Sequence, residues 1–372
     1  MKVLITGANG FVGKNLIAHL SERKDIEIVA FTRENSIAQL PLMVAETDFV
    51  FHLAGVNRPQ SQDEFKVGNT DLTSALCDAI KASGKPIPVL YTSSIQAERD
   101  NPYGVSKRAA EHLLNDLRVS HGSRVHVLRL PNVFGKWARP NYNSAVATFC
   151  HNITRGLPIQ VNDRQAEVSL VYIDDLIECL IKTMDVGEST DSVAQVRPVY
   201  RISVGELADQ LYAFYESRAT LISEAVGNGL VRALYSTYVS YLPVELFTYE
   251  VQKYGDPRGV FVEMLKTKDS GQFSYFTAHP GITRGGHYHH SKTEKFLVIK
   301  GNACFRFRHI VSGEFYELFT QGEEPRVVET VPGWTHDITN VGESEMIVML
   351  WANEIFDRER PDTYALPVGT QA

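Results

Sequence analysis

The sequence predicts two folded domains, an N-terminal α/β domain with a doubly wound parallel sheet and a C-terminal all-β sandwich or barrel. At 372 residues, the chain is longer than the roughly 250–300 residues at which single hydrophobic cores stop growing. Up to about residue 130, β-branched runs alternate with helical patterns, which indicates βαβ units. From about residue 246, short apolar runs are broken by Gly, Pro, Asn and Asp, which is typical of antiparallel β structure. We expect residues 1–243 and 244–372 to form the two domains.

In the first domain, each expected strand is followed by an expected helix. Helices are predicted from Lys14, around 70–83 and around 103–121. Residues 144–220 read as mostly helical, with a short strand region near 159–173, and we expect them to cover a substrate. The strand runs are KVLITG (2–7), IEIVAFT (26–32), DFVFHLAG (48–55), PVLYTSS (88–94) and RVHVLRL (124–130).

The second domain follows the tyrosine-rich stretch YSTYVSYLP at 235–243. Its short runs have the regular spacing that favours an antiparallel fold over a parallel one. They are GVFVEMLK (259–266), GQFSYFTA (271–278), EKFLVIKG (294–301), ACFRFRHI (303–310), EFYELF (314–319), RVVETV (326–331), HDITN (336–340) and MIVMLW (346–351).

Composition and charge exclude several classes of protein. With 44% hydrophobic and 22% charged residues, the chain reads as globular rather than disordered. A formal charge of -7 disfavours a general nucleic-acid or anionic-membrane surface. The longest apolar run near either end, 346–352, is far shorter than the ~20 residues that span a bilayer. We therefore expect no nucleic-acid partner and no membrane partner.

The compartment is predicted from the N-terminus and the cysteines. A strand pattern begins at Lys2, which leaves no room for a cleaved signal peptide. The four cysteines are scattered in apolar contexts and read as reduced core thiols. These two features predict a cytoplasmic protein. The cysteines are Cys77, Cys150, Cys179 and Cys304.

A glycine-rich turn, TGANGFVG, lies between the first strand and the first helix. Gly7, Gly10 and Gly13 are spaced three apart, which allows a tight turn and close approach of a pyrophosphate to the helix N-terminus. This pattern predicts a Rossmann-type dinucleotide site. Arg33, twenty positions after Gly13, stands where an acidic residue would bind a ribose hydroxyl, so it favours a 2′-phosphate and hence NADP. An ordinary surface charge is the alternative for Arg33.

The segment YGVSK places Tyr103 and Lys107 one helical turn apart, on one face of a helix. A lysine ammonium beside a phenol is expected to lower its pKa, so that Tyr103 can exchange a proton with a carbonyl oxygen while hydride moves at carbon. Ser94, at the end of the YTSS strand, can hydrogen-bond the same oxygen. The three residues are therefore candidates for catalysis.

The order TGxxGxxG, HLAG, TSS and YxxxK resembles the extended short-chain dehydrogenase/reductase family over roughly residues 1–240. The resemblance implies that Ser94, Tyr103 and Lys107 are catalytic and that Tyr103 and Lys107 also contact the cofactor. The other cofactor-binding residues that it implies are Gly7, Asn9, Gly10, Phe11, Val12, Gly13, Arg33, Leu53, Ala54 and Gly55.

This chain departs from the family in one place. Only nine positions separate Ser94 from Tyr103, fewer than is usual, so the loop that contributes to the substrate pocket is shortened. The segment RLPNVFG at 129–135 resembles the one that leads to the substrate site in nucleotide-sugar members. Asn132 is accordingly a candidate substrate contact, with a plain turn residue as the alternative.

In the second domain, HYHHSKTEKFLVIKG at 287–301 and PGWTHDITN at 332–340 match the two motifs of the cupin (jelly-roll) family. Histidines at alternate strand positions face the same side of a sheet. His287, His289, Glu294 and His336 are the expected ligands of Zn²⁺ or another divalent first-row metal. For His290 the role stays open between a ligand, an acid/base group and a solvated bystander.

The two domains in this order, with VYIDD (171–175), YSTYVSYLP and the tail WANEIFDRERPDTY (351–364), resemble the bifunctional UDP-sugar enzymes of capsule and O-antigen synthesis. The resemblance implies a place in the route to UDP-N-acetyl-L-fucosamine. The cupin would epimerise C3 of a UDP-2-acetamido-2,6-dideoxy-4-hexulose, and the reductase would reduce C4 with NADPH to the L-talose derivative. It also implies a UDP-sugar as partner, and we expect a homodimer.

Two alternatives remain open from the residues. The chain could be a dTDP- or GDP-linked 4-keto-sugar reductase whose cupin is the epimerase for another series of nucleotide sugars. The cupin could also be non-catalytic, its metal holding the domain together and assisting dimerisation.

Overall fold

The computed structural model divides the chain into two units, residues 1–144 with 168–201 and residues 145–167 with 202–372. The domain boundary predicted after residue 243 stays a prediction. Parts of two predicted segments, residues 263–264 and 355–358, lie outside the described residues. The structure describes residues 1–186, 196–256, 259–262, 265–267, 271–354 and 359–369.

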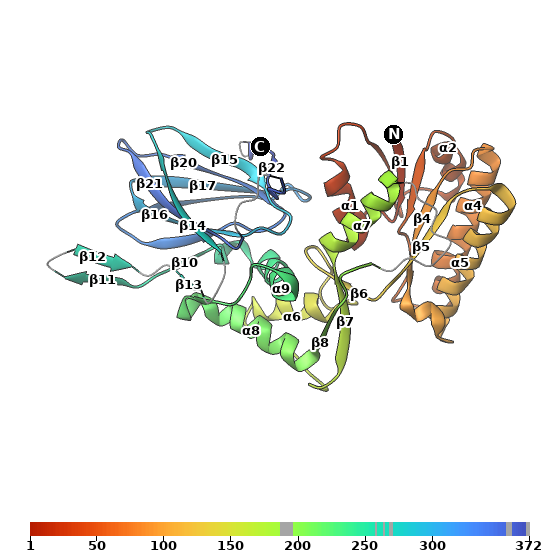
Figure 1. Cartoon of the computed structure of the whole chain (residues 1–372), viewed down its shortest axis with the longest axis horizontal. Coiled ribbons are helices and arrows are strands. Elements are labelled where there is room, and N and C mark those ends of the chain that lie inside the picture. Colours follow the sequence, from red (N-terminus) through yellow and green to blue (C-terminus); the bar gives the residue numbers. More distant parts are fainter. Residues whose placement is uncertain (187–195, 257–258, 263–264, 268–270, 355–358, 370–372) are drawn as a thin grey trace. The chain divides into compact units, whose positions relative to one another are not determined.

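A parallel sheet forms the centre of the first unit, with strand order β2-β1-β3-β4-β5 (Figure 1). Most positions of these strands are buried, which agrees with their nearly continuous apolar runs. The chain runs outward from β1 in both directions, so a doubly wound switch point lies beside β1. The strands are β1 (Lys2–Thr6), β2 (Glu27–Phe31), β3 (Phe49–His52), β4 (Val89–Ser94) and β5 (Val125–Leu130).

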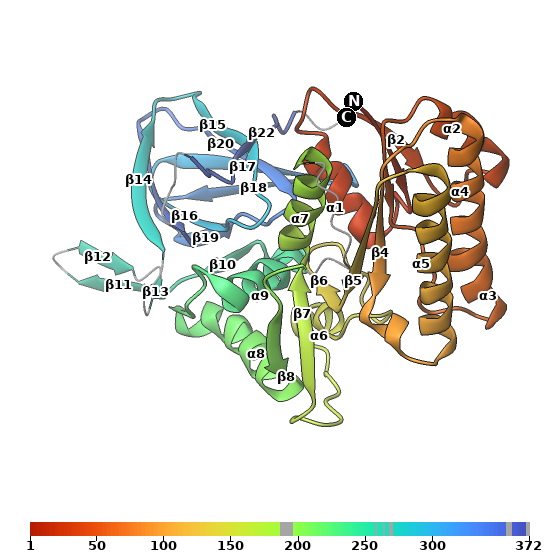
Figure 2. The same ribbon diagram turned by 45° about the vertical axis from the view of Figure 1, so that its right-hand side comes forward.

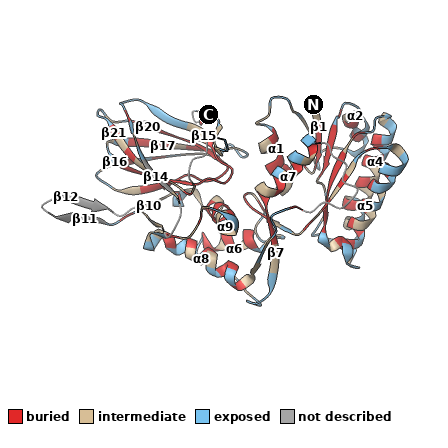
Figure 3. Cartoon of the chain, viewed as in Figure 1, coloured by how far each residue is buried: buried red, intermediate tan, exposed pale blue. Residues whose placement is uncertain are grey.

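Helices cover both faces of this sheet. α2, α4 and α5 pack with the strands into one apolar core, and α1 lies beside α7 on the opposite face (Figure 1). Figure 3 shows the strands buried and the outer helix surfaces exposed. The elements are α1 (Phe11–Leu20), η1 (Ile37–Gln39), α2 (Leu40–Ala45), α3 (Asp63–Phe65), the π-helix η2 (Lys66–Asp71), α4 (Leu72–Ser83), η3 (Ile95–Glu98), α5 (Pro102–His121) and α7 (Ile173–Val186).

The second unit begins with helices and ends in a β sandwich. In α9 every residue from Ala233 to Val239 is buried, so the tyrosine-rich stretch is core rather than surface. The helices are α6 (Ala145–Ile153), α8 (Val204–Thr220), α9 (Gly229–Ser240) and η4 (Val244–Leu246). Short strands elsewhere are β6 (Asn132–Phe134), β7 (Glu167–Tyr172) and β8 (Tyr200–Ser203) in one sheet, β9 (Ile222–Ser223) with β13 (Lys266–Thr267), and β11 (Lys253–Asp256) with β12 (Gly259–Val262).

Two five-stranded sheets make the sandwich, in the orders β10-β19-β16-β21-β14 and β18-β17-β20-β15-β22 (Figure 2). Aromatic rings from the two sheets meet inside it, with Phe296 5.7 Å from Phe305 between ring centroids. The strands are β10 (Thr248–Glu250), β14 (Gln272–Ala278), β15 (Thr283–Tyr288), β16 (Glu294–Lys300), β17 (Asn302–His309), β18 (Phe315–Gln321), β19 (Arg326–Glu329), β20 (Trp334–Asn340), β21 (Met346–Ala352) and β22 (Tyr364–Ala365).

A buried charge cluster joins the helices of the second unit to the sandwich. Glu329 of β19 pairs with Lys295 of β16 and with Arg218 of α8. The Tyr235 hydroxyl of α9 donates to Glu329 at 3.3 Å. Burial alone would raise the pKa of Glu329, but the two cations outweigh burial and lower it. The cluster is therefore an ion pair inside the protein, stabilised by partners on three elements.

The α/β plus all-β fold class that the sequence predicts is confirmed. The predicted helix at Lys14 begins earlier, at Phe11, because Gly10 is extended and serves as the N-cap. The strand predicted near 159–173 is shorter, at Glu167–Tyr172. No helix within the described ranges combines the length and apolarity needed to cross a bilayer.

Candidate functional site

The glycine-rich turn is packed too closely for side chains. Gly7 has φ +70°, and a Cβ there would lie 2.7 Å from the backbone nitrogen of Ala54, in the loop after β3. A Cβ on Gly13 would lie 2.4 Å from the Gly7 carbonyl oxygen. The turn thus brings the start of α1 and residues 53–55 together at the end of β1, the position where this fold binds a pyrophosphate.

The other predicted cofactor residues surround this turn. Asn9 and Gly10 are exposed, and Phe11 and Val12 are partly exposed at the first turn of α1, so a ligand can reach the helix N-terminus. Arg33 is exposed two residues beyond the end of β2. Its position suits a phosphate contact.

Lys107 and Tyr103 lie on successive turns of α5, beside the end of β4. The Lys107 ammonium donates to the Thr92 carbonyl at 3.0 Å and lies 4.7 Å from the centre of the Tyr91 ring. A Cβ on Gly55 would approach Lys107 Nζ to 3.1 Å, so the lysine reaches the predicted cofactor loop. The structure therefore brings one catalytic candidate next to the nucleotide-binding candidates.

Burial controls the protonation of this pair. Burial lowers the pKa of Lys107 to about 8, with Glu111 opposing the shift. Burial also raises the pKa of Tyr103, and a side-chain hydrogen bond with Ser94 opposes that shift. The sequence argument expected Lys107 to lower the Tyr103 pKa, whereas in the structure desolvation raises this pKa and the opposing effect comes from Ser94.

The short connection between Ser94 and Tyr103 is a single 3₁₀ turn, η3. Ser94 Oγ accepts from the Gln96 N–H at 3.1 Å, and the Asn101 side chain caps α5 by accepting from the Gly104 N–H at 2.8 Å. A Cβ on Gly104 would lie 2.1 Å from the Gln96 carbonyl oxygen. The trimmed loop therefore lies tightly against the start of the helix that carries Tyr103.

Asn132 is the exposed first residue of strand β6, whose other end is buried. Its side-chain amide donates to the Ser169 carbonyl of the neighbouring strand at 3.3 Å. This hydrogen bond links Asn132 to the neighbouring strand. A contact between Asn132 and the substrate stays a prediction.

A hydrogen-bond chain around His52 was not predicted. The Thr73 hydroxyl donates to the Asn69 carbonyl at 2.6 Å, so it must accept from His52 Nε2–H, 2.8 Å away. His52 Nδ1 then accepts from the Thr6 hydroxyl at 2.7 Å, and Thr6 Oγ1 accepts from the Ala54 N–H at 3.2 Å. Burial lowers the pKa of His52 to about 3, which keeps the ring neutral. These hydrogen bonds fix the position of the loop after β3.

Asn69 extends this chain to α5. Its side-chain amide donates to Ser106 Oγ at 2.9 Å, and Ser106 Oγ donates to the Tyr103 carbonyl at 2.8 Å. The loop that carries the cofactor candidates and the helix that carries Tyr103 are thus held by one set of buried hydrogen bonds. A polar residue in an otherwise apolar strand was the available sequence signal for His52.

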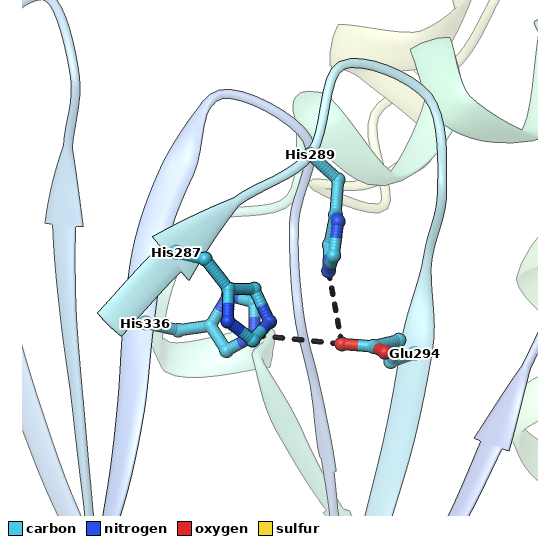
Figure 4. Close-up of side chains that lie close together, drawn as sticks. All are labelled: His287, His289, Glu294 and His336. Atoms are coloured by element: carbon cyan, nitrogen blue, oxygen red, sulfur yellow. Dashed lines mark hydrogen bonds and ion pairs between the residues drawn. The ribbon is translucent and has the colours of Figure 1, made fainter. Parts of the chain in front are cut away.

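In the second unit, His287, His289, Glu294 and His336 converge in the sandwich (Figure 4). His287, the penultimate residue of β15, pairs with His336 of β20, and Glu294 starts β16 in the other sheet. One ligand atom from each residue can be chosen so that all lie within 4.8 Å of one another. The sequence predicted this quartet, and the structure brings all four residues together.

The atoms of the quartet fit a divalent metal. Glu294 Oε2 lies 3.0 Å from His289 Nε2 and 3.4 Å from His336 Nε2. These distances match the edge of a tetrahedron with Zn–N bonds near 2.05 Å, which is about 3.3 Å. His289 Nδ1 must donate to the Asp362 carbonyl, 2.6 Å away, so the lone pair of a neutral ring at Nε2 faces the carboxylate. A cation held between these atoms removes that conflict.

The electrostatics also suit a cation. Burial, together with the neighbouring His336 and His289, lowers the pKa of His287 to about 4, so this ring offers a lone pair at neutral pH. Burial would raise the pKa of Glu294, but His289 and His336 outweigh it and hold the pKa well below its usual range. Neutral imidazoles and a carboxylate are the donor set that Zn²⁺ accepts.

His290 stands apart from the quartet. Its ring packs against Tyr288 and Tyr364, with ring centroids at 5.4 and 4.8 Å. At 3% exposure, His290 is not the solvated bystander that the sequence left open, and its roles as a ligand or an acid/base group stay predictions.

Comparison with known proteins agrees with this arrangement. Residues 3–196 match the NAD dependent epimerase/dehydratase family, and residues 254–364 match the Polysaccharide biosynthesis C-terminal domain. A Pseudomonas aeruginosa protein named UDP-2-acetamido-2,6-beta-L-arabino-hexul-4-ose reductase is 65% identical over 373 aligned residues, covering 100% of both chains.

Solved structures are similar as well. The capsular polysaccharide assembling protein CapF from Staphylococcus aureus is 43% identical with a TM-score of 0.68, over 99% of this chain and 100% of that one. A UDP-glucuronic acid 4-epimerase from Bacillus cereus, at 19% identity and a TM-score of 0.52, covers 59% of this chain and 85% of its own and shares the fold.

The family that matches the N-terminal half uses a nicotinamide nucleotide, in agreement with the turn at Gly7 and the residues gathered around it. The relatives that match the whole chain contain both halves in the same order. The chain belongs to the NAD dependent epimerase/dehydratase family, in the group that carries the Polysaccharide biosynthesis C-terminal domain.

Proposed function

We propose that the chain is a bifunctional UDP-sugar enzyme. Its metal-binding sandwich epimerises C3 of a UDP-2-acetamido-2,6-dideoxy-4-hexulose, and its first unit reduces the C4 ketone with NADPH to the UDP-2-acetamido-2,6-dideoxy-L-talose. The observation that carries the proposal is the 65% identity, over the full length, to a reductase named for a UDP-linked 4-hexulose. The product would be the precursor of UDP-N-acetyl-L-fucosamine.

The reductase half follows from the residues of α5 and β4. NADPH, when bound, supplies the hydride that C4 receives. Tyr103 donates the proton to the ketone oxygen, and its raised pKa keeps it protonated at neutral pH. Ser94 hydrogen-bonds with Tyr103 and is placed to orient the same oxygen. Lys107, with a pKa of about 8, keeps its charge at neutral pH next to the cofactor loop.

The preference for NADPH rests on Arg33. Its exposed guanidinium lies just beyond β2 and has the geometry to pair with a 2′-phosphate in two parallel hydrogen bonds. An acidic residue at this position would instead accept from the ribose hydroxyl.

The epimerase half rests on the quartet in the sandwich. His287, His289, Glu294 and His336 would hold Zn²⁺ or another divalent first-row ion. When bound, such an ion would supply Lewis acidity toward the C4 ketone and so weaken the neighbouring C3–H bond. The protein's own contribution is a dry, fixed set of donors: His289, Glu294 and His336 are buried, while His287 is partly exposed.

One observation favours the alternative of a structural, non-catalytic cupin. The quartet provides four protein donors, and a closed shell of four is typical of structural metal sites. In that case only the reductase would turn over, on this or another nucleotide-sugar series, and the sandwich would assist a homodimer.

Isotope exchange separates these proposals. The full-length protein is incubated with the UDP-linked 4-hexulose in heavy water without NADPH, and C3 is examined by mass spectrometry and NMR. We expect deuterium at C3 with the wild-type protein and none with His287→Ala. The exchange should also run without oxygen. Wild-type protein that incorporates no deuterium would leave the reductase alone as the function.

NADPH is then added to the same mixtures, and the experiment is repeated with dTDP- and GDP-linked 4-keto sugars. We expect the UDP substrate to be preferred and a reduced L-talose product to form. Sedimentation of the protein with and without a chelator tests the homodimer.

A further inference from the structure

In the loop that joins β15 to β16, one side chain from near the C-terminus binds the backbone of residues 290–292, while Ser236, Thr330 and Asn353 bind other groups of the loop. Asp362 accepts three consecutive backbone N–H groups with its carboxylate, those of His290 at 2.9 Å, Ser291 at 2.9 Å and Lys292 at 2.7 Å. The Ser291 hydroxyl adds a fourth bond at 3.0 Å. Residues 290–292 are 3–6% exposed, so these N–H groups depend on the carboxylate rather than on water.

The backbone of the same residue contacts the candidate metal site. The Asp362 carbonyl accepts from His289 Nδ1 at 2.6 Å, which leaves Nε2 as the ligand atom turned toward Glu294. Asp362 adopts φ +38°, in the left-handed region that Asp and Asn enter more readily than other residues with a side chain. One residue thus fixes both the loop and the orientation of the imidazole.

We propose that Asp362 is a positioning residue of the metal site, a role that rests on the proposed binding of a divalent ion by the quartet. The loop bound by Asp362 connects His289 to Glu294. It directly follows β15, the strand that carries His287. Three of the four donors therefore depend on the path of this short segment. Asp362 itself is not a ligand. It keeps the donors at metal-binding distance before the ion arrives, as outer partners of metal ligands do.

Neighbouring contacts provide a matched control. The Lys292 ammonium donates to Thr363 Oγ1 at 2.7 Å and to the Pro361 carbonyl at 3.2 Å. These bonds also tie the tail to the loop, but they contact neither the backbone N–H groups nor His289. Thr363→Val removes one of them while leaving the Asp362 carboxylate in place.

The test measures metal affinity rather than turnover. Full-length wild-type, Asp362→Asn, Asp362→Ala, Thr363→Val and His289→Ala proteins are stripped of metal and titrated with Zn²⁺ against a chromogenic chelator. Asp362→Asn is the sharpest variant, because asparagine tolerates the left-handed backbone while its NH₂ group cannot accept from the loop. If Asp362→Ala does not fold, Asp362→Asn still decides the outcome.

We expect Asp362→Asn to weaken zinc binding by about 10–100-fold, the range typical of outer partners. Thr363→Val should stay within about threefold of wild type, and NADPH binding should be unchanged in both. In the metal-free proteins, amide hydrogen exchange at 290–292 should be faster in Asp362→Asn than in wild type. A purely remote stability effect would not concentrate at these three amides.

Two results overturn the proposal in distinguishable ways. Equal zinc affinity of wild-type and Asp362→Asn proteins, with binding lost in His289→Ala, would keep the metal site and remove Asp362 from it. Wild-type protein that binds zinc no better than His289→Ala would remove the metal site, and the role of Asp362 with it.

Discussion

His52 and His336 are both buried histidines, but their surroundings are opposite. Both nitrogens of His52 are hydrogen-bonded, to Thr6 and to Thr73. Among the described residues, neither nitrogen of His336 has a well-aligned hydrogen-bond partner, and the nearest carboxylate oxygen, of Glu294, is 3.4 Å from Nε2. A buried polar atom without a partner is costly unless something else satisfies it. Both nitrogens of the first imidazole are satisfied within the protein, whereas Nε2 of the second lies near the Glu294 carboxylate, where the proposed metal ion would bind.

The same difference separates the two sites. The reductase residues lie on one helix and the neighbouring strand end, and buried hydrogen bonds hold their backbone. The candidate metal ligands come from β15, β16, β20 and the loop between the first two, and their donor atoms lie close to one another. The reductase half should therefore keep its geometry without its cofactor, whereas the metal half should depend on its ion.

The largest expected effect tests the reductase side. Tyr103→Phe should lower NADPH-dependent reduction by about 10²–10⁴-fold, because the proton donor is deleted. Metal content and deuterium exchange at C3 should be unchanged. The exposed Tyr212, 40% accessible, provides the control Tyr212→Phe. Wild-type reduction by Tyr103→Phe would end the assignment of Tyr103.

The next effect tests the metal side. His336→Ala should weaken zinc binding by more than the 10–100-fold expected for outer partners, because a ligand is removed. A chelator should then lower the thermal midpoint of wild-type protein but leave His336→Ala unaffected, since only a protein that binds the ion is stabilised by it. NADPH binding, measured by fluorescence, should stay the same. A chelator effect of equal size in both proteins would contradict the comparison.

His52 should show the reverse behaviour. His52→Phe leaves the Thr6 and Thr73 hydroxyls without their ring partner, at about 1–3 kcal/mol for each buried group. Urea unfolding should show this loss both with and without chelator. His52→Gln should lose less unfolding free energy than His52→Phe, because a glutamine amide can still donate at one end and accept at the other. A His52→Phe protein as stable as wild type would show that the chain does not hold the loop.

A smaller effect is expected at Arg33. Arg33→Ala should raise the KM for NADPH by roughly tenfold, in line with the loss of one or two hydrogen bonds to a charged group, and leave the KM for NADH nearly unchanged. Steady-state kinetics with both nucleotides decide this. An equal change in the KM for NADPH and for NADH would show that Arg33 acts as an ordinary surface charge and makes no specific contact with the 2′-phosphate.

The smallest effect is a pH dependence. Burial lowers the pKa of His52 from 6.5 to about 3, so the unfolded chain binds the extra proton between these values and the folded chain does not. The stabilising contribution is present above the higher pKa and is lost as the pH falls toward the lower one, at about 1.4 kcal/mol per pH unit. Between about pH 6.5 and pH 5.5, the unfolding free energy should fall by about 1 kcal/mol more for wild type than for His52→Gln. If the unfolding free energies of both proteins fell equally with pH, a group other than His52 would take up the proton.

Much of the fold and of both sites could be predicted because the relevant patterns are local. Gly7, Gly10 and Gly13 lie within one turn, and Tyr103 and Lys107 are one helical turn apart. Even the four metal donors fall into two short motifs. In each case, regular strand or helix geometry converts the spacing of residues along the sequence into closeness in the fold.

What could not be predicted depends on long-range contacts. Asp362 lies 70 to 72 positions from the backbone groups that it binds, and no spacing rule connects them. The direction of the Tyr103 pKa shift depends on how deeply the phenol is buried, which the spacing to Lys107 does not determine. His52 was visible as part of HLAG, but its partner Thr6 is known only from the parallel register of β1 and β3.

The charge cluster at Glu329 affects whether the C-terminal sandwich can be transferred to another gene without the helices that precede it. A fragment cut before residue 244 would lose Arg218 and Tyr235, two of the partners of Glu329. Lys295 and Glu329 would then lie on an open surface in place of a sealed one, and much of their mutual attraction would be lost to water. A fragment that starts at residue 202 keeps these partners. Inheritance of the sandwich as a working module therefore favours transfer together with α8 and α9.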